Sequence, residues 1–334
     1  MTSKPQTIPS ETAAVTIDKI RAAHARISPH IHRTPVLTSA SLNEIAGAQL
    51  FFKCENLQRT GSFKIRGAAN TVISLSDEQA KNGVAAPSSG NHAAAVSLAA
   101  RERGIPAFIV MPHNSSPAKI RAVEAYGGQI TFSEPNIRSR ESITAEVIAK
   151  TGAHLIHPYN DPRVMSGQGT AALELLEEVP DLDLVITPVS GGGLLSGTAI
   201  AAKSLKPEVR VLGAEPRNAD DAFRSFRSGK IEPAASSQTI ADGLRATLCP
   251  LTFAAITTYV AGIELVREEE IVSTMLLLWE RAKIVVEPSG AVSAAPALSG
   301  KFKGQGLRIG MILSGGNLDL KNLPFRQMHR RTRN

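Results

Sequence analysis

The feature that most constrains the fold of this chain is a regular alternation of short apolar runs with helix-like stretches, which begins near residue 83. Strands and helices that alternate in this way form βα units around a parallel sheet. The first series has predicted strands at 83–86, 106–111, 129–132 and 155–156 and predicted helices at 93–103, 117–126 and 138–150. The second has predicted strands at 184–189, 209–214 and 307–313 and predicted helices at 167–178, 194–205 and 268–283.

The two series predict two α/β units, and a chain of 334 residues is long enough for two domains. The first series forms a small unit of three βα repeats, and the second forms a larger unit. Residues 17–27 have the pattern of a helix and residues 49–53 form an apolar stretch. The local sequence does not assign either segment to one of the two units.

Composition limits the class of protein. Hydrophobic residues make up 43% and charged residues 20% of the chain, which excludes disordered, collagen-like and coiled-coil proteins. The N-terminal segment lacks the apolar core of a signal peptide, and no run of about 18 apolar residues occurs, so we expect neither secretion nor membrane spanning. Two cysteines, Cys54 and Cys249, cannot form a disulfide framework, which favours the cytoplasm.

The net charge of +7 comes from 37 basic and 30 acidic residues. The excess is concentrated near the C-terminus, at Arg326, Arg330, Arg331 and Arg333. Only 10 Phe, 3 Tyr and 1 Trp are available to stack on bases, so we expect a solvated tail and no nucleic-acid partner. Binding of an anionic substrate is a second use for the positive charge.

The first candidate for chemistry is a lysine in the segment Thr60–Ala68, which reads TGSFKIRGA. Lys64 follows a Gly-Ser turn and is flanked by Phe63 and Ile65. Partial burial among apolar neighbours lowers the pKa of an amine, and a neutral amine forms a Schiff base with a carbonyl compound. In isolation, however, the segment is more typical of an ordinary surface lysine at the start of a helix.

Three consecutive glycines lie in the segment Pro188–Leu194, PVSGGGL, between a predicted strand and a predicted helix. Backbone N–H groups in such a loop converge on a phosphate, and the helix dipole also favours an anion there. No Gly-Lys-Ser/Thr follows, so this is not a Walker loop. A tight turn without a ligand remains an alternative. A dinucleotide loop with Glu215 on the ribose is another, although Ser196 replaces the third glycine and Pro216 follows the acid.

The segment Ser88–His92, SSGNH, also lies between a predicted strand and a predicted helix. Its side chains and N–H groups lie at the carboxyl end of a parallel strand, where α/β proteins bind ligands. We therefore predict that a carboxylate or a ring oxygen binds here. Helix capping by Ser88 or Ser89 explains one serine but not the whole run.

Two further segments carry oxygen ligands. In Glu215–Asp221, EPRNADD, the carboxylates of Glu215 and Asp221 and a loop carbonyl between them suit Mg²⁺ or Ca²⁺. The same spacing fits an acidic loop that caps the next helix equally well. In Ile312–Asn317, ILSGGN, Ser314 ends a predicted strand beside two glycines, and this segment is also consistent with a simple turn.

The motifs SFKIRG, SSGNH, SGGGL and LSGGN, in this order and at this spacing, resemble those of the fold-type II pyridoxal-phosphate enzymes. The closest resemblance is to the serine racemase and serine/threonine dehydratase family, over roughly residues 34–320. It implies a tryptophan synthase β-like α/β fold with two open, mainly parallel, twisted sheets flanked by helices and an active site between the domains. The implied large cofactor-binding domain comprises residues 1–75 and 160–334, and the small α/β domain comprises residues 76–159.

The resemblance also implies roles for individual residues. Lys64 and Ser89 are the implied catalytic residues, on opposite faces of pyridoxal 5′-phosphate. The implied cofactor-binding residues are Phe63, Lys64, Asn91 at the ring hydroxyl, Ser190, Gly191, Gly192, Gly193 and Leu194 at the phosphate, Glu287, and Ser314 at the pyridine nitrogen. The implied substrate-binding residues are Ser88, Ser89, Gly90, Asn91, His92 and Arg140. The predicted ligands of Mg²⁺, or of Ca²⁺ or Mn²⁺, are Glu215, the Ala219 carbonyl and Asp221.

The implied reaction is dehydration of L-serine, and also of D-serine and L-threonine, to a keto acid and ammonia, with serine racemisation as a second activity. A serine such as Ser314 hydrogen-bonds only a neutral pyridine nitrogen, which leaves the ring a weaker electron sink than an aspartate would. This suits elimination and racemisation better than transamination. The family's racemases have a serine at the position of Ser89, where typical threonine dehydratases have alanine.

Three positions depart from the pattern of the animal racemases: Ala94, Tyr159 and Ala246. The first two replace a glutamine and an asparagine of the nucleotide-activator site, which removes support for activation by ATP. Arg140 is able to pair with a second substrate carboxylate, so a 3-hydroxyaspartate dehydratase is an alternative function.

Two alternatives from other classes remain open. One is a nicotinamide-dependent dehydrogenase that uses the glycine loop and Glu215, and the other is a non-catalytic pyridoxal-phosphate carrier. The family commonly forms homodimers. We therefore expect a homodimer with a small amino acid as substrate and with no membrane or nucleic-acid partner.

Overall fold

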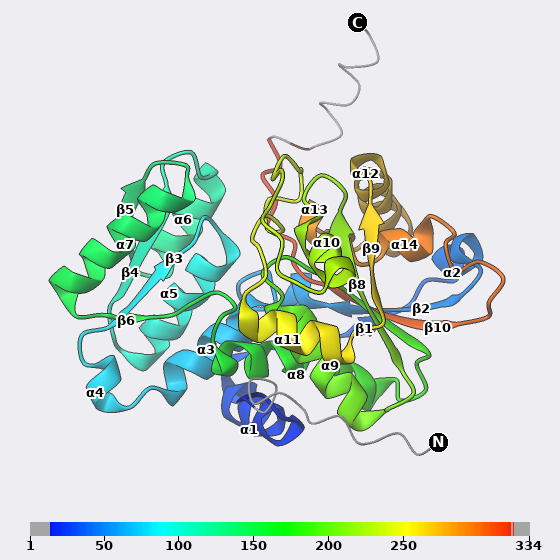
Figure 1. The fold of residues 1–334 in the computed structure, drawn as a ribbon, viewed down its shortest axis with the longest axis horizontal. Helices are drawn as coiled ribbons and strands as arrows, with labels where there is room; N and C mark the ends of the chain where they lie inside the picture. The colour runs from blue at the N-terminus through cyan, green and yellow to red at the C-terminus, as the bar shows by residue number, and fades with distance from the viewer. Residues whose placement is uncertain (1–13, 322, 324–334) are drawn as a thin grey trace, which may run out of the picture.

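The computed structural model describes residues 14–321 and 323, and Figure 1 shows its ribbon. Its larger sheet has six strands in the order β1-β2-β10-β7-β8-β9. Among these, β1 is antiparallel to β2 and the remaining neighbours are parallel. The strands are β1 (Val36–Leu37), β2 (Gln49–Cys54), β7 (Leu184–Pro188), β8 (Arg210–Pro216), β9 (Gly262–Val266) and β10 (Arg308–Leu313).

Helices cover both faces of the larger sheet (Figure 1). One face carries α1 (Ile17–Ile27), α8 (Pro162–Glu178), α9 (Gly193–Leu205) and α11 (Pro250–Tyr259). The other carries α2 (Ala40–Ala46), α12 (Glu268–Leu277), α13 (Pro288–Ala291) and α14 (Ala295–Leu298). The remaining helical elements of this unit are η2 (Ser28–His30), η3 (Glu55–Leu57), α10 (Asp221–Ser228) and the π-helical turn η4 (Leu278–Ala282).

Strand β7 of the larger sheet contributes alternate side chains to the hydrophobic cores on the two faces of the sheet. Leu184 and Ile186 of β7 belong to the cluster under α2 and α12, whereas Val185 belongs to the cluster under α8 and α9. Successive side chains of a strand point to opposite faces, and a parallel sheet is buried on both. This explains why the strand is apolar at every one of these positions.

The smaller sheet has four parallel strands in the order β5-β4-β3-β6. Its strands are β3 (Val84–Pro87), β4 (Ala107–Pro112), β5 (Gly128–Ser133) and β6 (His154–Leu155), and its helices are α4 (Asp77–Ala80), α5 (Asn91–Arg103), α6 (Pro117–Ala125) and α7 (Ile137–Thr151). Between the two sheets runs α3 (Lys64–Ser74), whose residues from Ile65 to Val72 are all buried (Figure 1). Because α3 packs on α5 and on α8, it joins the two units.

The predicted fold class, two mainly parallel sheets flanked by helices, is confirmed. Some predicted boundaries are wrong. α8 begins at Pro162 instead of residue 167, because Asp161 caps a helix with proline in its first turn. The predicted helix 268–283 ends as an α-helix at Leu277 and continues as a π-helical turn up to Lys283, whose φ is 61°.

The arginine-rich tail with Arg326, Arg330, Arg331 and Arg333, which we expect to be solvated, lies outside the described residues. Among the residues that are described, no helix combines the length and the apolar character needed to cross a membrane.

Candidate active site

A tight turn brings Lys64 to the end of β10. Gly61 has a φ of +69°, a left-handed conformation that favours glycine. The N–H of Phe63 then donates to the carbonyl of Ser314 at 3.0 Å. Lys64 follows as the first residue of α3, so this helix begins beside the loop that carries Ser314.

The Lys64 amine lies beside an aromatic ring and a backbone carbonyl. Its Nζ lies 5.0 Å from the centroid of the Phe63 ring and donates to the Pro158 carbonyl at 3.3 Å. Burial lowers the pKa of Lys64 from 10.5 to about 8. A lysine in this state is neutral far more often than a surface lysine, which favours its use as a nucleophile and a base.

The glycine loop joins β7 to the N-terminus of α9. Gly192 has a φ of +88°, and α9 begins at Gly193, so the first N–H groups of the helix have no partner within it. A side chain at Gly191 would lie 2.4 Å from ring atoms of Tyr159, which therefore packs directly on the loop. Leu194 is buried in the core below. The arrangement leaves backbone donors at a helix N-terminus, where an anion binds favourably.

The loop after β3 presents donors at the start of α5. Ser89 is exposed, and the Ser88 hydroxyl accepts a hydrogen bond from the N–H of Gly90 at 3.3 Å. α5 begins at Asn91, so its first-turn N–H groups also lack partners within the helix. The structure thus offers a second anion-binding helix N-terminus, suited to a carboxylate.

His92 lies below this loop and is buried. Its Nε2 is 3.0 Å from the carbonyl of Ile156. Because a carbonyl only accepts, Nε2 carries the proton of the ring. Burial, reinforced by the charge of Lys64, lowers the pKa of His92 to about 3. His92 is therefore a neutral side chain that ties α5 to the segment after β6.

Asn91 connects the small unit to the large one. Its Nδ2 donates to Glu287 Oε1 at 2.6 Å, and its Oδ1 accepts from Asn317 Nδ2 at 2.9 Å. Glu287 is buried, its Oε2 makes no hydrogen bond to the described residues, and burial raises its pKa to about 7. The amide of Asn91 is held in one orientation by these two contacts.

A chain of hydrogen bonds joins the remaining loops on the large unit. The Ser314 hydroxyl donates to the Ser289 carbonyl at 3.3 Å, and the Gly243 N–H donates to the Ser289 hydroxyl at 3.0 Å. The Ala246 N–H donates to the Ser190 hydroxyl at 2.9 Å. The segment 243–246 therefore spans the distance between the end of β10 and the glycine loop.

An ion pair connects the two units near the Ser88–His92 loop. Lys119 of α6 pairs with Asp242, on the loop that precedes Gly243. A side chain at Gly90 would lie 2.9 Å from Lys119 Cδ, so the lysine runs along the start of α5. Local sequence gave no indication of this pair, because the two residues come from different units.

Arg140 lies in the first turn of α7 and is partly buried. Burial, followed by the effect of Cys249, raises the pKa of Tyr159 to about 12, and the charge of Arg140 opposes this rise. The charge of Arg140 therefore acts on the tyrosine that packs on Gly191.

The predicted metal ligands lie between β8 and α10. Burial raises the pKa of Glu215 to about 8 and that of Asp221 to about 6. Glu215 accepts hydrogen bonds from the N–H groups of Ala222 at 2.9 Å and Phe223 at 2.8 Å, so it caps α10. Each of its oxygens accepts one of these two hydrogen bonds. The Ala219 N–H is bonded to the Pro216 carbonyl.

The described residues contain no cluster of three or more His, Cys, Asp or Glu side chains arranged for a metal ion. The predicted set differs from such a cluster because it has two carboxylates and one backbone carbonyl. Asp221 is buried, and its Oδ2 has no hydrogen-bond partner among the described residues. A buried carboxylate oxygen without a partner is costly unless a cation or a donor satisfies it.

The candidate site thus lies where the two sheets adjoin. It comprises Lys64, the N-termini of α5 and α9, and the loops that carry Ser89, Gly192 and Ser314. The chain belongs to the family of pyridoxal-phosphate dependent enzymes, which matches residues 27–315. The predicted family is confirmed, and the alternative hypothesis of a nicotinamide-dependent dehydrogenase is wrong.

The relatives narrow this class. A serine racemase of Oryza sativa subsp. indica is 52% identical over 312 residues, which are 92% of each chain. A beta-hydroxyaspartate dehydratase of Paracoccus denitrificans strain Pd 1222 is 51% identical over 310 residues, or 93% of this chain and 98% of the relative. The solved structure of maize serine racemase has a TM-score of 0.91 at 50% identity and covers 96% of this chain and 98% of that one.

Sequence motifs alone did not single out every residue of this site. Glu287 lies in no glycine-rich loop and entered only through the resemblance, although Glu-Pro at a helix start is a typical N-terminal signal. Asn317 ends the segment ILSGGN, but its bond to Asn91 joins positions 226 residues apart. Tyr159 was noted as a departure from the family pattern, and its packing on Gly191 is a tertiary contact.

Proposed function

We propose that this enzyme dehydrates L-serine to pyruvate and ammonia, accepts D-serine and L-threonine, and racemises serine as a second activity. The observation that carries the proposal is the position of Lys64. Its amine has a lowered pKa, and Lys64 begins α3 directly after Phe63, whose N–H is bonded to the Ser314 carbonyl. The similarity to plant serine racemases supports the choice of substrate.

The residues present fit pyridoxal 5′-phosphate. The first-turn N–H groups of α9, together with Ser190, Gly191, Gly192, Gly193 and Leu194, would hold the phosphate. Lys64 would bind the aldehyde and Phe63 would pack near the ring. Asn91 and Glu287 would lie at the ring hydroxyl, and Ser314 would face the ring nitrogen. The unpartnered Glu287 Oε2 supports a ligand at this point.

The proposed mechanism divides the work between two faces. The cofactor, when bound, supplies an electron sink that stabilises negative charge at the substrate Cα. Ser88, Ser89, Gly90, Asn91 and the first-turn N–H groups of α5 hold the substrate carboxylate, and His92 fixes the loop from below. The Lys64 amine takes the proton from Cα on one face, and the resulting ammonium group returns a proton to the β-hydroxyl, which leaves the β-carbon as water.

Racemisation requires a second acid–base group on the other face, and we propose that the Ser89 hydroxyl supplies it. Ser89 is exposed at the loop that binds the carboxylate. It donates a proton to Cα on the face opposite Lys64, which inverts the configuration. The same hydroxyl and Lys64 exchange roles when D-serine is the substrate.

We propose a structural and activating cation, Mg²⁺ or else Ca²⁺ or Mn²⁺, at Glu215, the Ala219 carbonyl and Asp221. The buried Asp221 Oδ2 without a partner supports it, and hard oxygen ligands suit these ions. Bound there, the ion would neutralise the two buried carboxylates and fix α10 against β8. Waters would complete its coordination.

A 3-hydroxyaspartate dehydratase is the second candidate function. The Paracoccus relative carries the name beta-hydroxyaspartate dehydratase, and Arg140 is a partly buried cation whose charge opposes the rise in the pKa of Tyr159. A guanidinium at the side-chain end of the substrate would bind a second carboxylate through charge-assisted hydrogen bonds.

We propose further that the chain forms a homodimer. Two exposed apolar side chains of the large unit, Leu57 and Val285, support this proposal. We propose that the large domain comprises residues 1–75 and 160–334 and that the small domain comprises residues 76–159.

We propose a cytoplasmic location, because Cys54 and Cys249 are both free cysteines, which is typical of a reducing compartment.

One experiment tests the core of this proposal. Wild-type protein is expected to bind pyridoxal 5′-phosphate through a link that borohydride makes permanent, and peptide mapping is expected to find it on Lys64. Lys64→Ala should lose both the link and turnover of L-serine. Full retention of a reducible link in Lys64→Ala would show that another residue binds the cofactor. A correct link without turnover of any amino acid would favour a carrier.

A further inference from the structure

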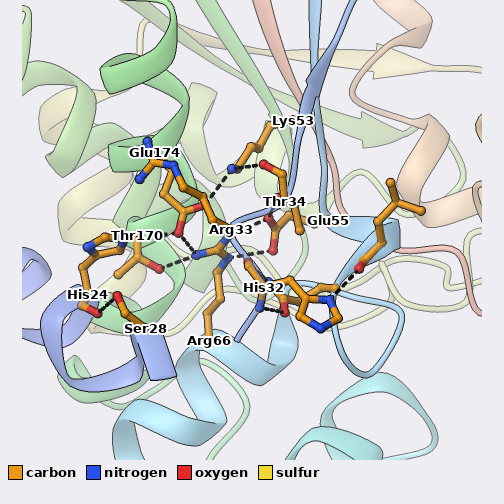
Figure 2. Close-up of polar contacts among 12 residues, drawn as sticks. His24, Ser28, His32, Arg33, Thr34, Lys53, Glu55, Arg66, Thr170 and Glu174 are labelled. Atoms are coloured by element: carbon orange, nitrogen blue, oxygen red, sulfur yellow. Dashed lines mark hydrogen bonds and ion pairs between the residues drawn. The ribbon is translucent and has the colours of Figure 1, made fainter. Parts of the chain in front are cut away.

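The first turn of α3 contains or adjoins four buried charged side chains, and the proposed reaction uses none of them (Figure 2). They are Lys53, Glu55, Arg66 and Glu174. Arg66 donates from Nε and Nη2 to both oxygens of Glu55, at 2.7 and 2.8 Å. It also donates from Nη1 and Nη2 to both oxygens of Glu174, at 2.8 Å each. Lys53 donates to Glu174 Oε2 at 2.6 Å. None of the four is more than 1% exposed.

The four charges balance, because Lys53 and Arg66 face Glu55 and Glu174. Thr34 donates to Glu55, Lys53 donates to the Thr34 carbonyl at 2.6 Å, and Arg66 donates to the Thr170 hydroxyl at 3.0 Å. His24 Nε2 also lies 3.2 Å from Glu174 Oε1. A buried ion pair often adds no more to the free energy of unfolding than apolar residues of similar size would. A fully satisfied buried network does impose one geometry on the elements that it joins.

The network joins α3, which begins at Lys64, to two neighbouring elements. Arg66 lies two residues after Lys64 on α3, Glu55 begins η3, and Glu174 belongs to α8. The α3 and α8 backbones touch, since a side chain at Gly167 would lie 2.5 Å from the Arg66 carbonyl. α8 in turn touches α9, which starts at the glycine loop, since a side chain at Gly169 would lie 2.8 Å from the Gly197 carbonyl.

We propose that Arg66 is a positioning residue for Lys64: its two-sided fork fixes the first turn of α3 between η3 and α8 and so holds the lysine amine at a set distance from the glycine loop. The inference rests on the proposed role of Lys64. A planar guanidinium with two carboxylates resists both rotation and translation of the turn, which a single ammonium group does not.

The test uses two variants and one control. Arg66→Lys keeps the charge but removes the fork. Lys53→Met/Glu174→Met removes one cation and one anion, so Arg66 keeps Glu55 and no buried charge is left alone. Glu177→Gln is the control, because Glu177 lies on the same helix and makes only an exposed ion pair with Arg33 among the contacts described.

Each apoprotein is mixed with pyridoxal 5′-phosphate, and the rate constant of covalent attachment at Lys64 is measured by borohydride trapping between pH 7 and 10. The melting temperature is recorded in parallel. We expect attachment at least tenfold slower in Arg66→Lys and in the double variant, with a shifted pH midpoint. In the double variant, attachment should be slow although the melting temperature stays close to that of wild type. Glu177→Gln should match wild type in attachment rate, pH midpoint and melting temperature.

If the double variant folds and attaches the cofactor at the wild-type rate with the wild-type midpoint, Arg66 has no positioning role. If it melts far below wild type and its attachment recovers fully at low temperature, the cluster serves stability alone and the inference is also wrong. Failure of the wild-type protein to attach the cofactor at Lys64 would instead overturn the proposed function.

Discussion

Asn91 and Glu287, 196 residues apart, share a hydrogen bond of 2.6 Å that joins the start of α5 to the start of α13. Asn91 belongs to the small sheet unit and Glu287 to the large one. The bond is buried on the Glu287 side, where burial raises the pKa of the carboxyl to about 7. Each unit thus supplies one of the two groups that we place at the cofactor's ring hydroxyl.

Asn91→Asp is expected to weaken cofactor binding at least tenfold. The substitution replaces a donor with a second carboxyl next to Glu287, and two carboxylates at hydrogen-bond distance disfavour each other's charge. Fluorescence titration of the apoprotein with pyridoxal 5′-phosphate measures the affinity. Asn136→Asp is the matched control, since Asn136 caps α7 through its side-chain oxygen and aspartate caps equally well. An unchanged affinity in Asn91→Asp would contradict the assignment.

The stability of the apoprotein should depend on pH through Lys64. Its pKa is lowered from 10.5 to about 8 by burial, so the unfolded chain binds more protons between these values. The penalty for the buried charge is complete below pH 8 and disappears as the pH rises to about 10.5. The free energy of unfolding of wild type, relative to Lys64→Met, should therefore increase over this range.

Urea denaturation at several pH values measures this difference. Lys150→Met, at an exposed position of α7, controls for the loss of a lysine. A difference between wild type and Lys64→Met that stays constant from pH 7 to 10.5 would mean that Lys64 titrates as in water.

Added Mg²⁺ should raise the melting temperature of wild-type protein but not that of Asp221→Asn. A ligand that binds only the native state adds stability by mass action, about 2.7 kcal/mol at a concentration of 100 times its Kd. Asp220→Asn is the matched control: Asp220 is the preceding residue and pairs with Arg224 at the surface. Equal shifts in all three proteins would place the ion elsewhere, and no shift in metal-free wild type would remove the site.

Ser89→Ala should lose activity on D-serine and serine racemisation while keeping dehydration of L-serine within about threefold. The reason is that proton transfer on the second face needs the Ser89 hydroxyl, whereas the variant keeps the backbone N–H at this position, Ser88 and the first-turn N–H groups of α5 for the substrate carboxylate. Values of kcat/KM for both enantiomers and chiral analysis of the product measure the effect. Equal losses for L-serine and D-serine would reduce Ser89 to a carboxylate ligand.

Arg140→Ala should leave L-serine and L-threonine dehydration within about threefold of wild type. If 3-hydroxyaspartate is the preferred substrate, the same variant should lose roughly ten- to a hundredfold in kcat/KM for it, because a hydrogen bond to a charged group contributes about 1.5–3 kcal/mol. Arg138→Ala, an exposed arginine two residues away on α7, is the control. A wild-type preference for 3-hydroxyaspartate that vanishes in Arg140→Ala would replace serine as the proposed substrate.

The sequence by itself determined the alternation of strands and helices and the loops in which the site lies. Continuous apolar runs, such as 184–186, and helix signals, such as Ser116-Pro117, act over a few residues and need no tertiary information. The same holds for Gly61 and Gly192, whose positive φ values belong to the turns that their neighbours predict. In parallel sheets all such loops face one edge, so motifs far apart in the chain were expected to meet.

Only the tertiary structure decided which charges are buried and which loops touch. Arg66 is of a residue type that is mostly exposed in proteins, yet it lies in the protein interior because α3 runs between two units. The Asn91–Glu287 bond, the Lys119–Asp242 pair and the packing of Tyr159 on Gly191 all join segments that the chain separates widely. Local propensity carries no information about such pairs, because their energy depends on the packing that brings the two groups out of water together.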